Sequence, residues 1–395
     1  MTETKQWGYI DINRLWLSSL VVLLFTSIHL TYLIPVTITS ALYYVLVLVA
    51  FISLFCTRGY IGIRTIGFWG LGAAVLSILN MVMIGNQNLI RTGILLASFF
   101  LAVLLLNEEV DEKAFSVSVY VNALLIVFKI LQQGVGVKAQ IYEVCSNNYV
   151  SILLLSPAVI YYAVCNARNK NCSILPILCT TLLSFMMGGR GGVLSTGILL
   201  VGVFLHKYFR DKESRRDRVI LGVILCAVII PIIVYGLIRI FSSESDLYIV
   251  DRINRRGMEG GQRLDIWAEY LTDLGVNWKY FMFGVDQSII YWAMPFGGNL
   301  HNSYLFVHAY LGIIGFVVFI IMILRAAYKA VRARKWLYFC TLLTFCFRGM
   351  TDHVFGSNRI TVVILALIFL PDLIDLSGTG SSDNFQKGGF LHNEH

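Results

Sequence analysis

The sequence predicts an all-α, polytopic integral membrane protein of about twelve transmembrane helices with one large loop outside the membrane. Of its 395 residues, 57% are hydrophobic and only 14% are charged, and the mean hydropathy is +0.73. Apolar runs of roughly 20 residues, the length at which a helix crosses a bilayer, recur along nearly the whole chain. These runs are continuous and lack the alternating pattern of a membrane barrel, so helices are the expected means of satisfying the backbone in hydrocarbon.

The apolar runs define the expected spans in chain order. They are 15–34, 36–56, 66–84, 89–106, 115–133, 149–166, 173–188, 191–208, 219–241, 303–324, 335–350 and 358–371. No cleavage-like site follows the first run, which predicts an anchor and not a removable signal peptide. The expected parts are an N-terminal membrane bundle of about nine spans (1–241), a large outer loop with short interfacial helices (242–302), a C-terminal membrane bundle of about three spans (303–376) and a disordered cytoplasmic tail (377–395).

Lysine and arginine concentrate in alternate loops, and this sets the expected orientation, because cytoplasmic loops are enriched in these residues. With the N-terminus inside, the basic residues on the cytoplasmic side include Lys5, Arg14, Arg58, Arg64, Lys113, Arg168, Lys170, Lys207, Arg210, Lys212, Arg215, Arg216, Arg218, Arg325, Lys329, Arg332, Arg334 and Lys335. The large loop has five Lys or Arg against eight Asp or Glu between Ser242 and Leu300, so it lacks this bias and falls outside. Both termini are expected in the cytoplasm.

Composition also narrows the function classes. The eight cysteines show no CxxC or Cys/His ligand spacing, and most lie in or beside apolar runs, which predicts a packing role. The distribution of the net charge of +8 indicates topology signals and lipid headgroups, not nucleic acid. The sequence contains no acidic pair suited to a metal-bound sugar nucleotide, no nucleophile elbow and no zinc motif, so neither a metal nor a cofactor is expected.

Several charged residues and histidines fall on the predicted outer side, where topology signals would not require them. They are Arg190 in the turn Gly188–Gly192, Arg263 and His301 toward the two ends of the large loop, and Arg348, Asp352, His353 and Arg359 in the short turn 347–359. Charged groups at membrane depth are costly and are usually functional or paired. We therefore expect a functional site at the outer face.

His301 stands where the large loop re-enters the membrane, just before an uninterrupted apolar span. Imidazole accepts and donates protons near neutral pH, so a histidine at the outer end of a span can act as a general base on a substrate at the bilayer surface. A capping or hydrogen-bonded histidine is the structural alternative. His308, on the same helical face, is expected to be structural or to support His301.

Residues 262–274 are typical of a short amphipathic helix lying in the interface, with leucines on the same side as Trp267. Trp267 would then lie in the headgroup zone. Arg263, on the same face, would reach toward the mouth of the bundle, or would only contact lipid phosphate.

Arg190 combines a guanidinium with exposed backbone N–H groups just before a helix begins. This is a suitable cradle for an anion such as a diphosphate, with a plain tight turn as the alternative. Asp352 is a single outer carboxylate that either orients a histidine or pairs with Arg348. Pairing is the role we expect.

Three motifs in this order resemble the O-antigen polymerase and ligase superfamily (Wzy/WaaL-like). They are Gly-Arg-Gly-Gly-Val-Leu (189–194), Gln-Arg-Leu-Asp-Ile-Trp (262–267), and His-Asn-Ser-Tyr-Leu (301–305) followed by Leu-Gly-Ile-Ile-Gly (311–315). The span layout is similar over nearly the whole chain. The resemblance implies a GT-C-like glycosyltransferase of the bacterial inner membrane that needs neither metal nor nucleotide. Its substrate would be an undecaprenyl-diphosphate-linked oligosaccharide at the periplasmic or extracellular face.

The resemblance also implies roles for individual residues. Arg190 and Arg263 would bind the diphosphate of the donor, and His301 would be the base that activates the acceptor hydroxyl. The candidates for supporting residues are Arg348, Asp352, His353, Trp267 and Asn302. The implied partners are membrane lipids, a flippase and a chain-length regulator.

Two activities share these motifs. A polymerase transfers the growing glycan onto the next lipid-linked repeat unit, and a ligase transfers it to lipid A-core. The outer turn 347–355, with Thr351 and Asp352 after an arginine, is more similar to the polymerases. A flippase for lipid-linked oligosaccharide is the alternative of another class. It is disfavoured because mid-span charges are few and the two halves of the sequence do not repeat.

Overall fold

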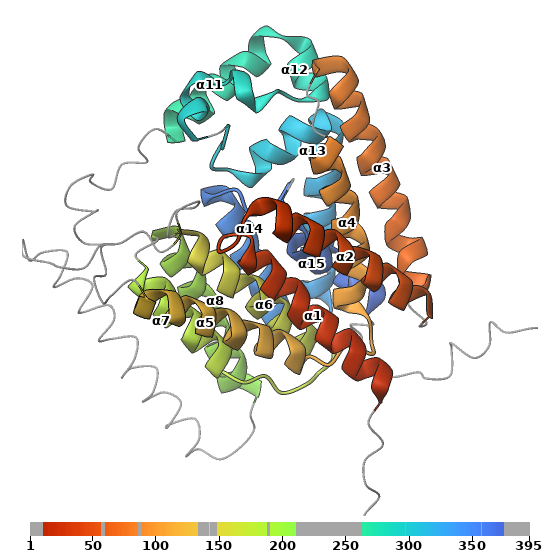
Figure 1. The fold of residues 1–395 in the computed structure, drawn as a ribbon, viewed down its shortest axis with the longest axis vertical. Coiled ribbons are helices and arrows are strands. Elements are labelled where there is room, and N and C mark those ends of the chain that lie inside the picture. The colour runs from red at the N-terminus through yellow and green to blue at the C-terminus, as the bar shows by residue number, and fades with distance from the viewer. Residues whose placement is uncertain are drawn as a thin grey trace, which may run out of the picture.

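The computed structural model describes residues 11–56, 60–85, 89–132, 142, 148–187, 190–210, 263–296, 298–356 and 358–374. Every regular element within these ranges is a helix (Figure 1). Eight of these helices are long and apolar enough to cross a membrane. The prediction of an all-α, polytopic membrane protein is therefore confirmed.

The helices follow the predicted spans closely. The first eight are α1 (Ile12–Leu30), α2 (Val36–Cys56), α3 (Tyr60–Ile84), α4 (Leu89–Leu106), α5 (Lys113–Gln132), α6 (Asn148–Ala167), α7 (Leu175–Met186) and α8 (Arg190–Arg210). The later ones are α11 (Arg263–Val276), α12 (Trp278–Phe283), the 3-10 helices η1 (Gln287–Ile289) and η2 (Tyr291–Phe296), α13 (Ser303–Arg332), α14 (Trp336–Thr351) and α15 (Thr361–Leu373). The predicted span 219–241, the first part of the large loop and the tail 377–395 lie outside the described residues, so the count of about twelve spans stays a prediction.

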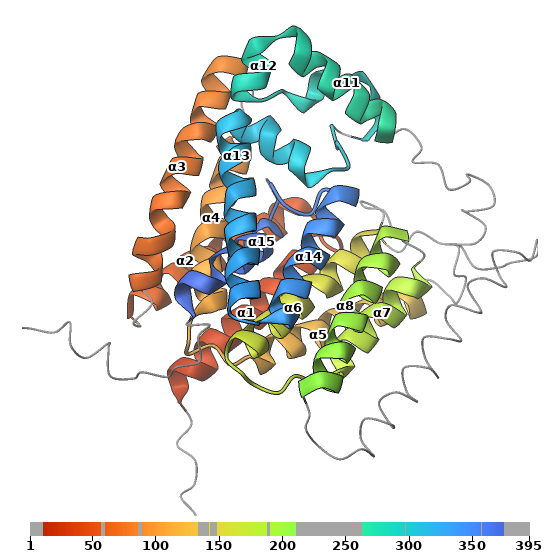
Figure 2. The ribbon, with the colours of Figure 1, turned by 180° about the vertical axis from the view of Figure 1, so that it is seen from behind.

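Two groups of helices form the membrane bundle. Helices α3, α4 and α13 run along the longest axis of the molecule, while α5 to α8 pack side by side (Figures 1 and 2). Helices α11 and α12 lie across one end, where α12 packs against α3 and α13 and α11 packs against α12 and η2. The described part of the large loop is thus a helical cap on the bundle.

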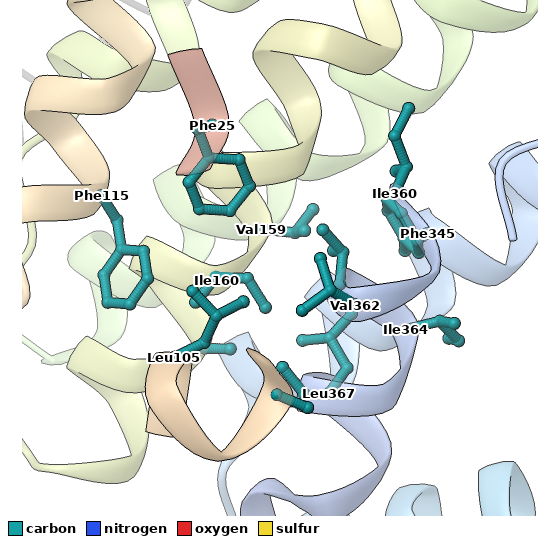
Figure 3. Close-up of a cluster of buried hydrophobic side chains, with 14 of the residues drawn as sticks. Phe25, Leu105, Phe115, Val159, Ile160, Phe345, Ile360, Val362, Ile364 and Leu367 are labelled. Atoms are coloured by element: carbon teal, nitrogen blue, oxygen red, sulfur yellow. The ribbon is translucent and has the colours of Figure 1, made fainter. Parts of the chain in front are cut away.

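The core is centred on α6 and α15. Every residue of α6 from Val150 to Ala167 is buried, as is α15 from Thr361 to Leu370. In Figure 3 the side chains of Val159 and Ile160 lie among those of Phe25, Leu105 and Phe115 on one side and those of α15 on the other. Helix α6 contacts α1, α5, α7, α8, α14 and α15, so it lies at the centre of the bundle.

Pro157 interrupts α6, and a polar contact compensates for it. Proline has no backbone N–H, so the carbonyl of Leu153 loses its usual donor within the helix. The side chain of Asn122 in α5 donates to that carbonyl through Nδ2 (3.2 Å). Its Oδ1 lies 3.3 Å from Nδ1 of the buried His29 in α1. These buried polar residues therefore join three helices.

A second break occurs in α13 at Gly312, where φ is 63° and ψ is −171°. This left-handed conformation favours glycine, and a Cβ at Gly312 would also collide with the carbonyl oxygen of Met282 in α12. Asn80 in α3 donates through Nδ2 to the carbonyls of Ala309 (2.8 Å) and Phe283 (2.6 Å). The kink thus fixes α12 against the bundle.

The turns predicted to be outside meet at one end of the bundle, here called the outer end. Arg359 after α14 donates to Thr31 Oγ1 after α1 (2.6 Å), and Arg348 Nη2 donates to the carbonyl of Asn148 at the start of α6 (3.1 Å). The turns predicted to be cytoplasmic meet at the opposite end. Their ion pairs include Arg14–Asp111 (3.0 Å), Lys170–Glu112 (2.7 Å), Arg325–Asp372 (2.5 Å) and Lys329–Asp372 (2.7 Å).

Candidate active site

Helix α11 covers the outer end with a buried face centred on Ile266 and Tyr270, both 0% exposed. Trp267 lies beside this face, and its Nε1 donates to the carbonyl of Leu300 (2.9 Å). Trp267 therefore packs against the start of α13, and its place relative to the lipid headgroups stays a prediction. Trp267, Leu264 and Leu271 were predicted to share one apolar side of this helix. Trp267 packs inward, whereas Leu264 and Leu271 are exposed. The surface of α13 beneath α11 determines which residues of α11 turn inward. The sequence pattern of α11 alone carries no information about that surface.

The chain passes from the loop into α13 through a strained residue. His301 has φ of +50°, a left-handed conformation uncommon for a residue with a side chain. Asn299 Oδ1 accepts from its backbone N–H (2.8 Å). Asn302 then caps α13, since its Oδ1 accepts from the N–H groups of Tyr304 (2.9 Å) and Leu305 (3.3 Å). Asn302 therefore has a structural role, and it fixes where the His301 side chain begins.

His301 faces a buried carboxylate. Its Nδ1 lies 3.7 Å from Asp352 Oδ1, just beyond hydrogen-bond distance. The other oxygen of Asp352 lies 3.3 Å from Nη2 of Arg348. Side chains of Asp352 and Arg348 are 2% and 1% exposed, whereas that of His301 is 19% exposed. Both roles considered for Asp352, facing a histidine and pairing with Arg348, are thus seen together.

Ser303 locks the outer turn after α14 onto the start of α13. Its hydroxyl donates to the carbonyl of Asp352 (2.8 Å) and accepts from the N–H groups of Val354 (2.7 Å) and Phe355 (3.1 Å). The residue is fully buried. Sequence reasoning missed Ser303, and the available signal was a polar residue at the first position of an apolar span.

Arg190 and Arg263, the two arginines predicted to bind diphosphate, begin helices α8 and α11, and both helix starts lie at the same outer turn. Arg263 Nη1 donates to the carbonyl of Thr351 (2.7 Å), and Arg348 Nη1 donates to its hydroxyl (2.9 Å). Arg190 begins α8, although its side chain lies outside the described residues. The next residue, Gly191, lies so close to the turn that a Cβ there would be 2.8 Å from Thr351 Oγ1 and 3.5 Å from Arg348 Nη1. The start of α8, the start of α11 and the outer turn therefore meet at Thr351.

Electrostatics keep the carboxylate ionised. Burial alone would raise the pKa of Asp352, but the nearby His301 ring and the positive charges of Arg348 and Arg263 outweigh it and hold that pKa well below its usual range. The site therefore presents a fixed negative charge behind His301, surrounded by guanidinium groups.

His353 has a different environment from His301. Its ring stacks on Phe306 of α13, with centroids 3.5 Å apart and planes inclined by 13°. Burial lowers the pKa of His353 to about 3; Arg91 and His301 add to the effect, and Asp352 opposes it. His353 is therefore a neutral imidazole at physiological pH.

Two other outer residues do not join this cluster. The ring nitrogens of His308 contact the hydroxyl of Tyr270 (2.7 Å) and the carbonyl of Phe281 (3.0 Å), which ties α11 and α12 to α13. The guanidinium of Arg359 packs 4.8 Å from the ring of Tyr43 and contacts α1 and α2. These contacts are structural.

The chemistry available is proton transfer with anion binding. His301 is partly accessible, a carboxylate lies behind it, and Arg263 and Arg348 lie on one side. Within the ranges that the structure describes, no group of three or more His, Cys, Asp or Glu side chains could hold a metal ion. No protein-family model matches the chain, and no curated protein is significantly similar to it.

Proposed function

We propose that this protein is a membrane glycosyltransferase that polymerises a surface polysaccharide of the O-antigen type. It would transfer a growing glycan from undecaprenyl diphosphate to the next lipid-linked repeat unit, at the outer face of the bacterial inner membrane. The observation that carries the proposal is the approach of His301 to the buried Asp352 at the end of the bundle where Arg263 and the start of α8 meet. The resemblance to the O-antigen polymerase and ligase superfamily supplies the substrate class.

The positions of these groups support the following reaction. Asp352 attracts the N–H at Nδ1 of His301, which leaves the lone pair on Nε2. Nε2 takes the proton from the acceptor hydroxyl as its oxygen forms the new bond to the anomeric carbon of the donor. The bond from that carbon to the diphosphate oxygen breaks, and its electron pair leaves with the polyprenyl diphosphate. The imidazolium that forms is stabilised by Asp352, and their separation of 3.7 Å shortens as the charge appears.

The leaving group is stabilised by guanidinium groups. A diphosphate gains negative charge as the glycosidic bond breaks, and arginine binds such oxygens through two parallel hydrogen bonds. Arg263 and Arg190 are assigned this role. In this proposal the protein has a GT-C-like fold of about twelve spans, with both termini in the cytoplasm.

A gene deletion distinguishes this function from its alternatives. Loss of a polymerase leaves a single repeat unit on the surface glycan. Loss of a ligase leaves the lipid A-core without any repeats, and loss of a flippase traps lipid-linked repeats inside the cell. We expect the first phenotype on glycan gels, and either of the other two would reject the polymerase assignment.

A further inference from the structure

A further arginine lies near the candidate site, on the side of α4. Arg91 belongs to the first turn of α4, and its guanidinium carbon lies 5.2 Å from the centroid of the Tyr310 ring. Its Nη1 donates to Oε1 of Gln287 in η1 (3.1 Å), and the carboxylate of Asp286 attracts its charge. Arg91 is thus positioned by the cap and by α13 together.

The side-chain amide of Gln287, beside Arg91, is hydrogen-bonded only at its oxygen among the described residues. The residue is 4% exposed, and its Oε1 accepts from both Arg91 and the hydroxyl of Tyr310 (3.1 Å each). Two donors at one end fix the orientation of the amide, so the other end is the N–H₂ donor. Among the described residues, this Nε2 has no hydrogen-bond partner, and neither does Nε2 of His353. Buried polar groups without partners are costly, which suggests a ligand that satisfies them.

A row of stacked rings links His353 to Arg91. Arg263 and Arg348 contact Thr351, and the next residue, Asp352, faces His301. His353 then stacks on Phe306, and Phe306 stacks on Tyr310 with centroids 6.3 Å apart. Arg91 lies over the Tyr310 ring at the end of this row. The charge of Arg91 also lowers the pKa of His353, so a further cationic group lies near the residue that follows Asp352.

We propose that Arg91 and Gln287 form a second diphosphate subsite, which binds the polyprenyl diphosphate of the acceptor. This inference rests on the proposed function, because a polymerase joins two lipid-linked molecules. One cationic site then holds the donor headgroup and releases it, while the other holds the acceptor so that its hydroxyl reaches His301. The guanidinium and the amide N–H₂ are both donors, as an anionic headgroup requires.

The test counts bound lipids by native mass spectrometry of the purified full-length protein with undecaprenyl diphosphate. Wild type is expected to bind two molecules. Gln287→Glu keeps an acceptor for Arg91 and Tyr310 but removes the N–H₂ donor and adds a repelling charge, so it is expected to bind one. Arg91→Ala should also bind one, and Arg91→Lys should raise the dissociation constant of the second molecule about tenfold. Lys279→Ala, which removes an exposed cation of the cap, should still bind two.

The outcomes separate this inference from the proposed function. Wild type that binds no undecaprenyl diphosphate would contradict the proposed function itself. Binding of two molecules in wild type and in both Gln287→Glu and Arg91→Ala would overturn the second subsite alone. Competing ligands identify the source of the headgroup. Displacement of the second molecule by inorganic diphosphate, but not by phosphatidylglycerol, is expected, and equal displacement by phosphatidylglycerol would reduce the subsite to a general contact for anionic lipid.

Discussion

His301 Nδ1 lies 3.7 Å from Asp352 Oδ1, although His301 precedes α13 and Asp352 follows α14. The contact exists because Ser303 bonds the outer turn after α14 to the first residues of α13. Asn302, between them, caps α13 and so fixes the backbone beside His301. One short sequence, His301 to Ser303, thus presents an imidazole, begins a helix and anchors the residue whose carboxylate lies beside that imidazole.

Replacing Asp352 with Asn is expected to destabilise the protein by about 3 kcal/mol at pH 7, because a buried ion pair with Arg348 loses one partner. The native pKa of Asp352 lies below that of the unfolded chain. Its carboxylate therefore stabilises the fold above about pH 4, and this contribution is lost as the pH falls further. Thermal unfolding in detergent, measured for both proteins, should show a constant difference from pH 8 to 5 that shrinks below pH 4. A difference that grows on acidification would contradict this reading.

Replacing Arg263 with Ala is expected to reduce glycan transfer about 100-fold, since one donor to the leaving diphosphate is lost. Arg263→Lys should recover only part of the activity, because lysine has no fork of parallel N–H groups. Transfer rates on lipid-linked repeat units provide the measurement. Lys279→Ala is the matched control on the same cap and should behave as wild type. Full activity of Arg263→Ala would exclude a role in binding the diphosphate.

Ser303→Ala is expected to lower stability by about 1–3 kcal/mol for each buried backbone group that it leaves unpaired. Thr272, whose hydroxyl bonds only to the carbonyl of Ala268 on the exposed surface of α11, is the control. Thr272→Ala should unfold at the wild-type temperature in the same detergent. Equal unfolding temperatures for all three proteins would show that Ser303 does not hold the outer turn in place.

An epitope tag inserted after Val276, which is 84% exposed at the end of α11, should be accessible to antibody in intact spheroplasts. A second tag after Arg334, in the basic turn between α13 and α14, should become accessible only after the membrane is permeabilised. Lysine and arginine counts predict this orientation. The reverse pattern would place the candidate site in the cytoplasm and remove the basis of the proposed function.

Much of the bundle was predictable because continuous apolar runs and alternating basic loops are local signals. Span 36–56 coincides with α2 and span 89–106 with α4. The residues Arg263, His301 and Asp352 were also named from the sequence, since each is out of place near a membrane.

Other parts of the site depend on contacts between distant segments. Trp267 turned inward because the surface of α13 beneath it determines which face of α11 is buried. Ser303, Gln287 and Arg91 were missed for the same reason. A serine beside a cap, a glutamine in a loop and an arginine at a helix start are unremarkable until the folded chain places them together.

The central claim is that His301 is the base for glycan transfer, and His301→Asn tests it most directly. Asparagine tolerates the left-handed backbone that His301 adopts, so the variant keeps the fold while losing the imidazole. Purified protein in proteoliposomes with undecaprenyl-diphosphate-linked repeat units should extend them into a ladder, and the variant should do so at least about 100-fold more slowly. A ladder of wild-type length and rate from His301→Asn would contradict the account.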